Sequence, residues 1–211
     1  MTAPLTVPDA IRHRRSVKQF KPDAIPADVL DQIVELTLLA PSSFNLQPWR
    51  VVALTDPAQK QALSAAAWNQ KQIVQAPVVF VFAVDLRGWE KTMEGVILNA
   101  SQLGAWPEKV AAYFKEAIPV FQNGLGAQAR EYAVKDALIA ATHTALAAES
   151  FGLGSCYMNG WVEAEVKKII GAGDNPDIAI ALVLPVGYPA ETPKFSGRLD
   201  RSVTYFENRL K

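Results

Sequence analysis

A short helix, expected over residues 8–15, ends in three cations and a hydroxyl: Arg14, Arg15, Ser16 and Lys18. Guanidinium groups form strong charge-assisted hydrogen bonds with phosphate oxygens. If the chain is extended after the helix, Ser16 and Lys18 point to the same side. The same composition is also typical of a solvated basic turn. The segment therefore predicts either an anion clamp or an exposed turn.

A polar loop between an apolar helix and an apolar strand is the second candidate. Residues 41–48 are bounded by prolines, and aromatic rings lie within and directly after them. Serine and asparagine favour ordinary turns, so a plain connection is one reading. The other is a site for a flat ring with a polar edge, since amides suit the edge and apolar groups suit the faces. The hydrogen-bonding side chains of this loop include Ser42, Ser43, Asn45 and Gln47.

The third candidate for a binding segment is residues 152–161, which contain several glycines. Glycine allows the backbone to approach a ligand closely and exposes its N–H groups. Taken alone, the segment equally indicates a helix C-cap followed by a turn.

The chain contains one cysteine, Cys156, and two histidines, His13 and His143. This set excludes a disulfide within one chain and leaves little material for a zinc centre or a hydrolytic triad. A lone cysteine beside a glycine is usually a small buried residue. We expect His143 to pack at an interface and His13 to be exposed.

Composition limits the class of protein. The chain has 211 residues, half of them apolar, which excludes a disordered chain. The 21 basic and 21 acidic residues cancel, so we expect no nucleic-acid partner. The N-terminus lacks a secretory pattern, and the apolar run at 77–84 is too short to cross a membrane. We expect a cytoplasmic protein without a membrane partner.

Several predicted elements position these candidates in a single domain, 1–211, of the α+β class with a central sheet. The expected helices are 26–40, 57–67, 127–150 and 162–170, and the expected strands are 49–55, 77–84 and 178–187. Asp56 is the expected cap of the second of these helices. Residues 87–126 are expected to form a helical excursion or lid, and residues 188–211 an arm without helix caps that lies on something else.

The helix at 127–150 is rich in alanine, which allows another helix to approach closely. Its expected buried stripe comprises Val134, Leu138, Ala141, Ala145 and Ala148.

In their joint order and spacing, these segments resemble the nitroreductase-like family of FMN-dependent oxidoreductases. The resemblance covers almost the whole chain except 87–126, and the loop at 40–49 is its most specific part. The other matching segments are 14–18, 69–72 before the strand that begins at Ala76-Pro77, 152–154, 184–189 and 197–199.

The resemblance implies a mostly antiparallel sheet flanked by helices in an intertwined homodimer, with FMN at the subunit interface. By position, Arg14, Ser16 and Arg198 would bind the 5′-phosphate, with Arg15 a weaker candidate. A dianion in a partly buried site needs several convergent donors.

The ring contacts implied by the resemblance come from three further segments. Lys18, Asn69 and either Lys71 or Gln72 would meet the pyrimidine edge, because relatives often carry a lysine near position 72. Ser42, Ser43 and Asn45, with Gln47 beside them, would come from the partner subunit. The opposite face of the ring would lie along Tyr157, Met158, Asn159 and Gly160.

Two positions depart from the family pattern. Asn159 stands where some relatives have glutamate, and Asp200 replaces a common proline.

The implied reaction transfers two electrons from NADH or NADPH, through flavin N5, to nitroaromatics, quinones or related flat electrophiles by a ping-pong mechanism. No side chain need act as a nucleophile, since the cofactor carries the chemistry. Trp106, Tyr113 or Phe121 could wall the acceptor slot, or simply anchor a helical flap.

Other readings stay open at this point. The same scaffold could reduce an enal, a semialdehyde or a halogenated ring. It could also be a non-catalytic FMN store, or a dimerisation module without a ligand.

Overall fold

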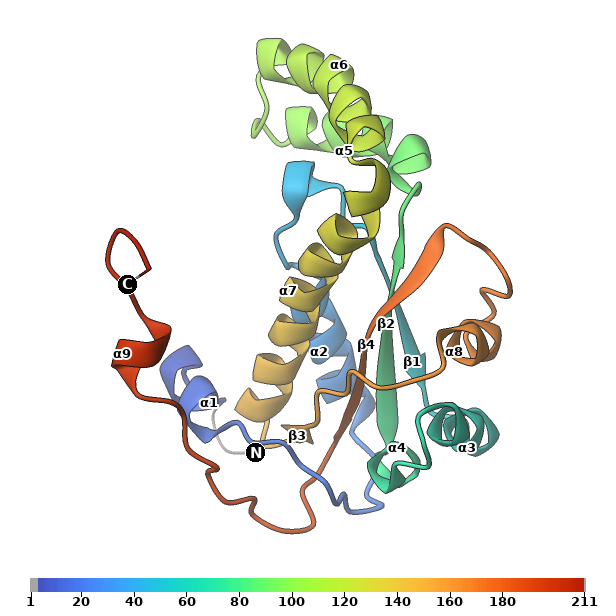
Figure 1. Cartoon of the computed structure of the whole chain (residues 1–211), viewed down its shortest axis with the longest axis vertical. Coiled ribbons are helices and arrows are strands. Elements are labelled where there is room, and N and C mark those ends of the chain that lie inside the picture. Colours follow the sequence, from blue (N-terminus) through green and yellow to red (C-terminus); the bar gives the residue numbers. More distant parts are fainter. Residues whose placement is uncertain (1–3, 211) are drawn as a thin grey trace.

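The computed structural model describes residues 4–210. Figure 1 shows a sheet between two layers of helices, with a helical pair at one end and an arm at the C-terminus. The helices are α1 (Val7–His13), α2 (Ala27–Leu38), α3 (Pro57–Ala66), α4 (Lys71–Gln75), α5 (Trp89–Gln102), α6 (Glu108–Gly124), α7 (Ala129–Ser150), α8 (Glu163–Ile169) and α9 (Arg201–Thr204). The short 3₁₀ helices are η1 (Ser43–Asn45) and η2 (Gly126–Gln128). The strands are β1 (Trp49–Leu54), β2 (Val78–Asp85), β3 (Gly154–Ser155) and β4 (Ile178–Gly187).

The four strands form one sheet in the order β1-β2-β4-β3, and every neighbouring pair is antiparallel. This arrangement confirms the predicted α+β class with an antiparallel sheet. The first seven residues of the core strand β2 are valine, phenylalanine or alanine, and all seven are buried. Such a run is stable as a strand only when both faces of the sheet are covered.

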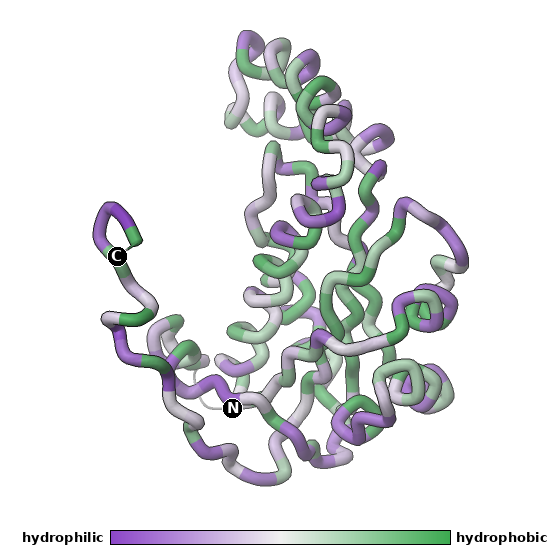
Figure 2. The backbone as a smooth tube through the Cα atoms, viewed as in Figure 1, coloured by the Kyte–Doolittle hydropathy of each residue, from purple (hydrophilic) through white to green (hydrophobic). Residues whose placement is uncertain are grey.

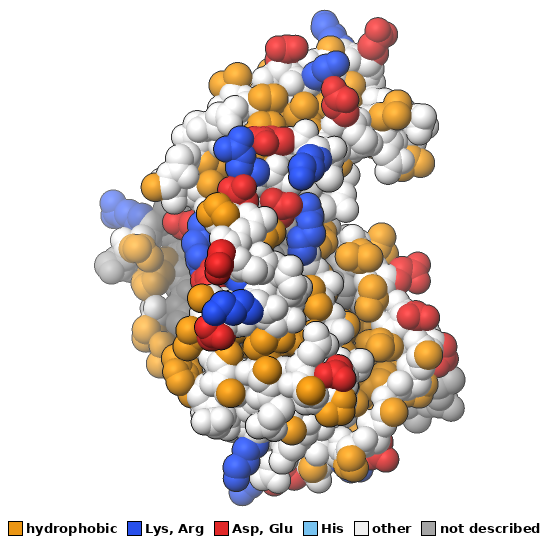
Figure 3. Space-filling view, turned by 90° about the vertical axis from the view of Figure 1, so that its right-hand side faces the viewer, with side chains coloured by type: hydrophobic (Ala, Val, Ile, Leu, Met, Phe, Trp, Pro, Cys, Tyr) orange, Lys and Arg blue, Asp and Glu red, His pale blue; other side chains and the backbone are white. Residues whose placement is uncertain are grey.

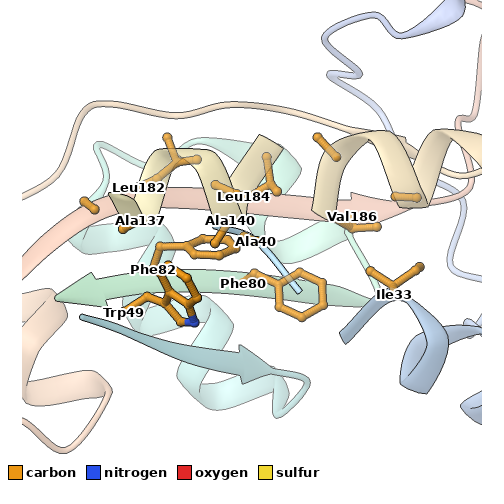
Figure 4. Packing of buried hydrophobic residues seen from close by; sticks show 14 of the residues in the cluster. Ile33, Ala40, Trp49, Phe80, Phe82, Ala137, Ala140, Leu182, Leu184 and Val186 are labelled. Carbon is orange, nitrogen blue, oxygen red and sulfur yellow. The ribbon is translucent and has the colours of Figure 1, made fainter. Parts of the chain in front are cut away.

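Helices cover both faces (Figure 1). Phe80 and Phe82 of β2 pack with residues of α2 and α7 on one face. Figure 4 shows these two rings beside Trp49, beneath the small side chains of α7. On the opposite face, Val79 and Val81 pack with residues of α3, α4 and α8.

The long helix α7 differs from the predicted stripe. Ala141, Ala145 and Ala148 are buried as expected, but Leu138 is 37% exposed and Val134 only partly buried. Because α7 packs against both the sheet and α2, its buried arc is wide and is made of small residues. The additional members of that arc are Ala133, Asp136, Ala137, Ala140, Thr144 and Ala147.

A local signal placed the start of α3 correctly, whereas the predicted ends of α2 were too wide. The Asp56 carboxylate accepts a hydrogen bond of 2.8 Å from the Gln59 N–H, which confirms the predicted cap of α3. Helix α2 is shorter than the predicted 26–40, because Pro26 is its N-cap and its last helical residue is Leu38.

Helices α5 and α6 extend beyond the end of the sheet. Figure 3 shows a hollow between this upper lobe and the rest of the molecule. Within residues 4–210, no helix is long and apolar enough to span a membrane.

The C-terminal segment runs away from the body of the chain (Figure 1) and alternates between polar and apolar residues (Figure 2). The expectation that it has no helix caps was wrong. Asp200 accepts a hydrogen bond of 2.9 Å from the Ser202 N–H and begins the one-turn helix α9. An aspartate that caps the first turn satisfies a backbone donor that would otherwise be free.

Candidate functional site

Arg14 lies directly after α1, where its N–H donates to the Ala10 carbonyl at 2.9 Å. Its guanidinium carbon is 5.7 Å from the centre of the Tyr157 ring. The Nη1 atom is buried, and no hydrogen-bond partner for it exists among residues 4–210. A buried cationic donor without a partner is costly, so this atom is suited to an anionic ligand.

Glu149 of α7 adds a half-buried carboxyl group beside these cations. Burial raises the pKa of Glu149, while the charges of Arg14, His13 and Arg15 act in the opposite direction. Glu149 therefore lies close enough to these basic residues for their charges to oppose the effect of its burial.

Phe195 connects the C-terminal segment to the same region. The Arg15 guanidinium is 4.7 Å from the centre of this ring, and the Arg198 guanidinium is 5.2 Å from it. Two cations stacked on one ring bring Arg198 to the predicted anion clamp, although about 180 residues separate it from Arg14. Arg198 is exposed, and its Nη1 donates to the Gly197 carbonyl at 2.6 Å.

Ser16 pairs with Ser155 of β3 in a parallel bridge, and the Val17 N–H donates to the Ser155 carbonyl at 3.0 Å. Val17 is buried, whereas Ser16 and Lys18 are exposed, as the predicted alternation requires. A Cβ at Gly154 would overlap the Val17 side chain, so glycine permits this pairing. The Ser155 hydroxyl is a second buried group without a partner among the described residues.

Lys18 points toward Cys156, with its Nζ 3.2 Å from the thiol sulfur. Cys156 is buried, as the sequence predicted for a lone cysteine. Lys18 thus connects the first segment with the third.

The segment before α4 has an unusual backbone. Trp68 and Asn69 are both left-handed, with φ of 58°. Asn69 is held in this conformation by its N–H, which donates to the Ser64 carbonyl at 2.7 Å. Lys71 is exposed, whereas Gln72 is buried and donates to the Gln70 side chain at 2.9 Å.

Residues 157–160 run beside this segment. The Met158 N–H donates to the Val183 carbonyl at 3.0 Å, and Asn159 is exposed. A Cβ at Gly160 would overlap the Trp68 ring, so glycine lets an exposed tryptophan lie against the chain. Burial raises the pKa of the Tyr157 phenol, whose oxygen is 3.5 Å from the Ala141 carbonyl.

The polar loop is folded by its own side chains. The Ser42 hydroxyl accepts from the Gln47 N–H at 2.9 Å, and the Asn45 side chain accepts from the Gln47 amide at 3.1 Å. Arg50 donates to the Gln47 carbonyl at 3.3 Å and forms an ion pair with Asp85 at 3.2 Å.

The structure leaves this loop apart from the other candidate residues. Ser43 contacts Asp136, whereas Arg14 lies near Glu149. Thirteen residues separate the two acids along α7, which corresponds to about 20 Å of helix. One chain therefore carries two candidate half-sites, which lie about 20 Å apart along α7.

Sequence reasoning did not single out Trp68, Asp136, Ser155 or Phe195. A tryptophan directly before Asn69 and an aspartate in an alanine-rich helix were visible in the sequence. Their roles depend on partners far along the chain, so no local pattern could have identified them.

The aromatic residues of the upper lobe meet the loop at Phe44. The centre of this ring is 5.6 Å from that of Phe114 and 5.3 Å from that of Phe121. A shallow hollow of about 460 Å³ is lined by Phe44, Tyr113 and Phe121, among others. The Trp106 ring is tilted by 53° against Phe114, with the ring centres 4.7 Å apart, and it does not line this hollow.

These features fit an FMN ligand. The unpartnered Arg14 nitrogen and Ser155 hydroxyl offer donors to a phosphate. Exposed Lys18, Asn69 and Asn159 offer polar groups to the edge of a ring. No group of three metal-ligating side chains occurs in the described part of the chain.

Comparisons with known proteins identify the family of this chain. A model of the nitroreductase family matches residues 11–188. A Thermus thermophilus protein named NADH dehydrogenase is 37% identical over 203 residues, which cover 94% of this chain and 96% of the relative. A Bacillus subtilis protein named FMN reductase (NADPH) is 29% identical over 201 residues, which cover 95% and 72% of the two chains.

A solved structure from Exiguobacterium sibiricum, in complex with FMN, has a TM-score of 0.85 to this chain at 20% identity and covers 98% of it and 99% of that chain. The fold is therefore shared along the whole chain, and the family model spans most of it. The chain belongs to the nitroreductase family.

Proposed function

We propose that this chain is an FMN-dependent oxidoreductase that takes two electrons from NAD(P)H and passes them to flat electrophilic acceptors in alternate half-reactions. The buried Arg14 nitrogen, which has no hydrogen-bond partner among residues 4–210, carries this proposal, together with family membership. The names of the two relatives support FMN and a nicotinamide donor.

The bound flavin would supply reversible two-electron chemistry, and the residues of the chain would bind and orient it. Arg14, with Ser16 and Arg198, would bind the phosphate. Lys18 and Asn69 would meet the polar edge of the ring, and the cation would favour an anionic reduced form. Of the two candidates for a second contact with this edge, Lys71 is exposed and Gln72 is buried, so Lys71 would make that contact.

The active unit would be a homodimer. The chain exposes 12498 Å², whereas a compact monomer of 23.0 kDa exposes roughly 9,600 Å². An apolar groove of about 390 Å³ between α1, α2 and α7 supports an interface, since exposed Val7, Leu36 and Leu39 line it. A second copy would cover this groove and bring its loop 42–47 to the clamp of the first chain.

His143 also lines this groove, with its Nδ1 3.2 Å from the Leu36 carbonyl. That position supports the expected interface role. His13 is exposed.

Acceptors would be nitroaromatics, quinones or other flat electrophiles. The aromatic hollow at Phe44, Tyr113 and Phe121 supports this class, because aromatic rings favour stacking on flat ligands. Helices α5 and α6 would then serve as a lid that excludes water from the site.

The experiment removes the clamp and follows the cofactor. We expect the Arg14→Ala/Arg198→Ala variant to lose FMN while its far-UV circular dichroism stays unchanged. Arg12→Ala is the matched control, since Arg12 is an exposed arginine two residues before Arg14 and forms an ion pair with Asp9. Tight FMN binding in the double variant would show that the phosphate site is assigned wrongly.

A second measurement separates an enzyme from a store. NADH or NADPH should bleach the yellow wild-type protein without air. A protein that retains FMN but is bleached by neither donor would contradict catalysis and support storage.

A further inference from the structure

Asp136 is a buried carboxylate that accepts two hydrogen bonds from one residue of the polar loop, Ser43. Its side chain comes from α7, and the residue is only 6% exposed. One carboxylate oxygen accepts the Ser43 N–H at 3.2 Å, and the other accepts the Ser43 hydroxyl at 3.3 Å. Both oxygens therefore hold one serine that lies 93 residues away along the chain.

The loop needs such an anchor because its backbone is strained. Phe44, Asn45 and Gln47 have φ of 51°, 54° and 49°, in the left-handed region that L-residues disfavour. The Ser42 hydroxyl accepts a hydrogen bond from the Gln47 N–H. Ser42 makes no side-chain cap for the 3₁₀ helix that starts at Ser43. Asp136 supplies the missing acceptor from another element.

The cost of burying this group indicates a role beyond packing. Loss of solvent raises the pKa of Asp136, and the two bonds from Ser43 offset that effect only in part. An apolar residue would avoid this cost. The carboxylate contributes a fixed orientation for Ser43.

We propose that Asp136 is a positioning residue that holds Ser43 as a hydrogen-bond acceptor toward FMN. A serine hydroxyl has one hydrogen and two lone pairs. When its hydrogen is donated to Asp136, Ser43 offers a ligand only lone pairs. It therefore selects a donor, such as a ring N–H or a ribityl hydroxyl. The inference rests on the proposed FMN site and adds to it the direction of one hydrogen bond.

Asp136→Asn tests this assignment with little change in shape. The amide retains one acceptor but turns hydrogens toward the second Ser43 donor. We expect FMN to bind about tenfold more weakly, in line with the loss of one well-aligned hydrogen bond. The measurement is the dissociation constant from the fluorescence of FMN released on dilution of the holoprotein, with KM and kcat determined separately.

Glu131→Gln is the matched control. Glu131 lies on the same helix and is exposed, and it pairs with Lys135 at 2.7 Å. The same acid-to-amide change there should leave the FMN dissociation constant unchanged.

A double-mutant cycle separates positioning from stability. If Asp136 acts through the Ser43 hydroxyl, Ser43→Ala/Asp136→Asn should bind FMN no more weakly than Ser43→Ala. Fully additive losses would overturn the inference. If Asp136→Asn does not fold, Asp136→Glu keeps the charge but displaces it, and wild-type FMN affinity in that variant would also overturn it.

The outcomes distinguish this inference from the proposed function. If wild-type protein binds FMN and Asp136→Asn binds it equally well, the positioning role is wrong and the FMN site stands. If wild-type protein does not bind FMN, the proposed function is wrong.

Discussion

From the direction of its pKa shift, a single buried carboxyl group is expected to make the stability of this protein depend on pH. Asp136 is this group, because burial raises its pKa above the ordinary value. The folded protein then binds this proton more tightly than the unfolded chain. The stabilising effect of Asp136 is therefore fully present below its unfolded pKa of about 3.9, and it is lost as pH rises through the raised folded value.

We expect the free energy of unfolding of the wild type, minus that of Asp136→Asn, to fall as pH rises from acid toward neutral. Urea titrations at several pH values measure this difference. The corresponding difference between the wild type and Glu131→Gln should instead rise with pH, because the hydrogen bond with Lys135 lowers the pKa of Glu131. The contribution of Glu131 is lost as pH falls through that lowered value. A difference for Asp136 that does not vary with pH would contradict the buried carboxylate.

At the scale of elements, helix α5 carries a glycine in its middle. A Cβ at Gly95 would meet nothing within 4 Å. Alanine loses less backbone entropy than glycine on folding into a helix. We expect Gly95→Ala to increase the free energy of unfolding by about 0.5–1 kcal/mol, measured by urea denaturation.

Gly160→Ala provides the contrast, because its Cβ would overlap Trp68. That variant should lose stability and shift the tryptophan fluorescence, since the ring must move. Removal of the ring in Gly160→Ala/Trp68→Ala should relieve the loss. Equal effects of the two alanine substitutions would show that close approach at Gly160 is unimportant.

For the whole molecule, the separation of the two half-sites leads to a test by complementation. Each site of the proposed dimer takes the clamp from one subunit and the loop from its partner. A hybrid of an Arg198→Ala subunit with a Ser43→Ala subunit should then contain one intact site and one doubly defective site. We expect such hybrids, isolated with two different tags, to bind about half as much FMN as the wild type, as two-fold symmetry requires.

Homodimers of either single variant are the controls, since both of their sites carry the defect. If clamp and loop served the same site within one chain, the hybrid would contain no intact site and would bind FMN no better than these controls.

Much of the fold could be predicted from local signals. The apolar run at 77–84 predicted β2, because only a strand covered on both faces tolerates it. Asp56 before a proline placed the start of α3 at the correct residue. The alternation around Val17 placed Ser16 and Lys18 on one exposed side. Each of these signals lies within a few residues of the feature it predicts.

The sequence by itself thus determined most of the longer helices and strands, the α+β class and the list of chemically capable residues, but not α4 or α9. Only the tertiary structure decided which of them lack partners within residues 4–210: Arg14 is partly buried and its Nη1 has no hydrogen-bond partner there, whereas Arg15 lies over the Phe195 ring. It also decided that Asp136 holds Ser43. The physical reason is that burial and pairing depend on groups that the chain path brings together across large sequence separations, whereas periodicity and capping act within one or two turns.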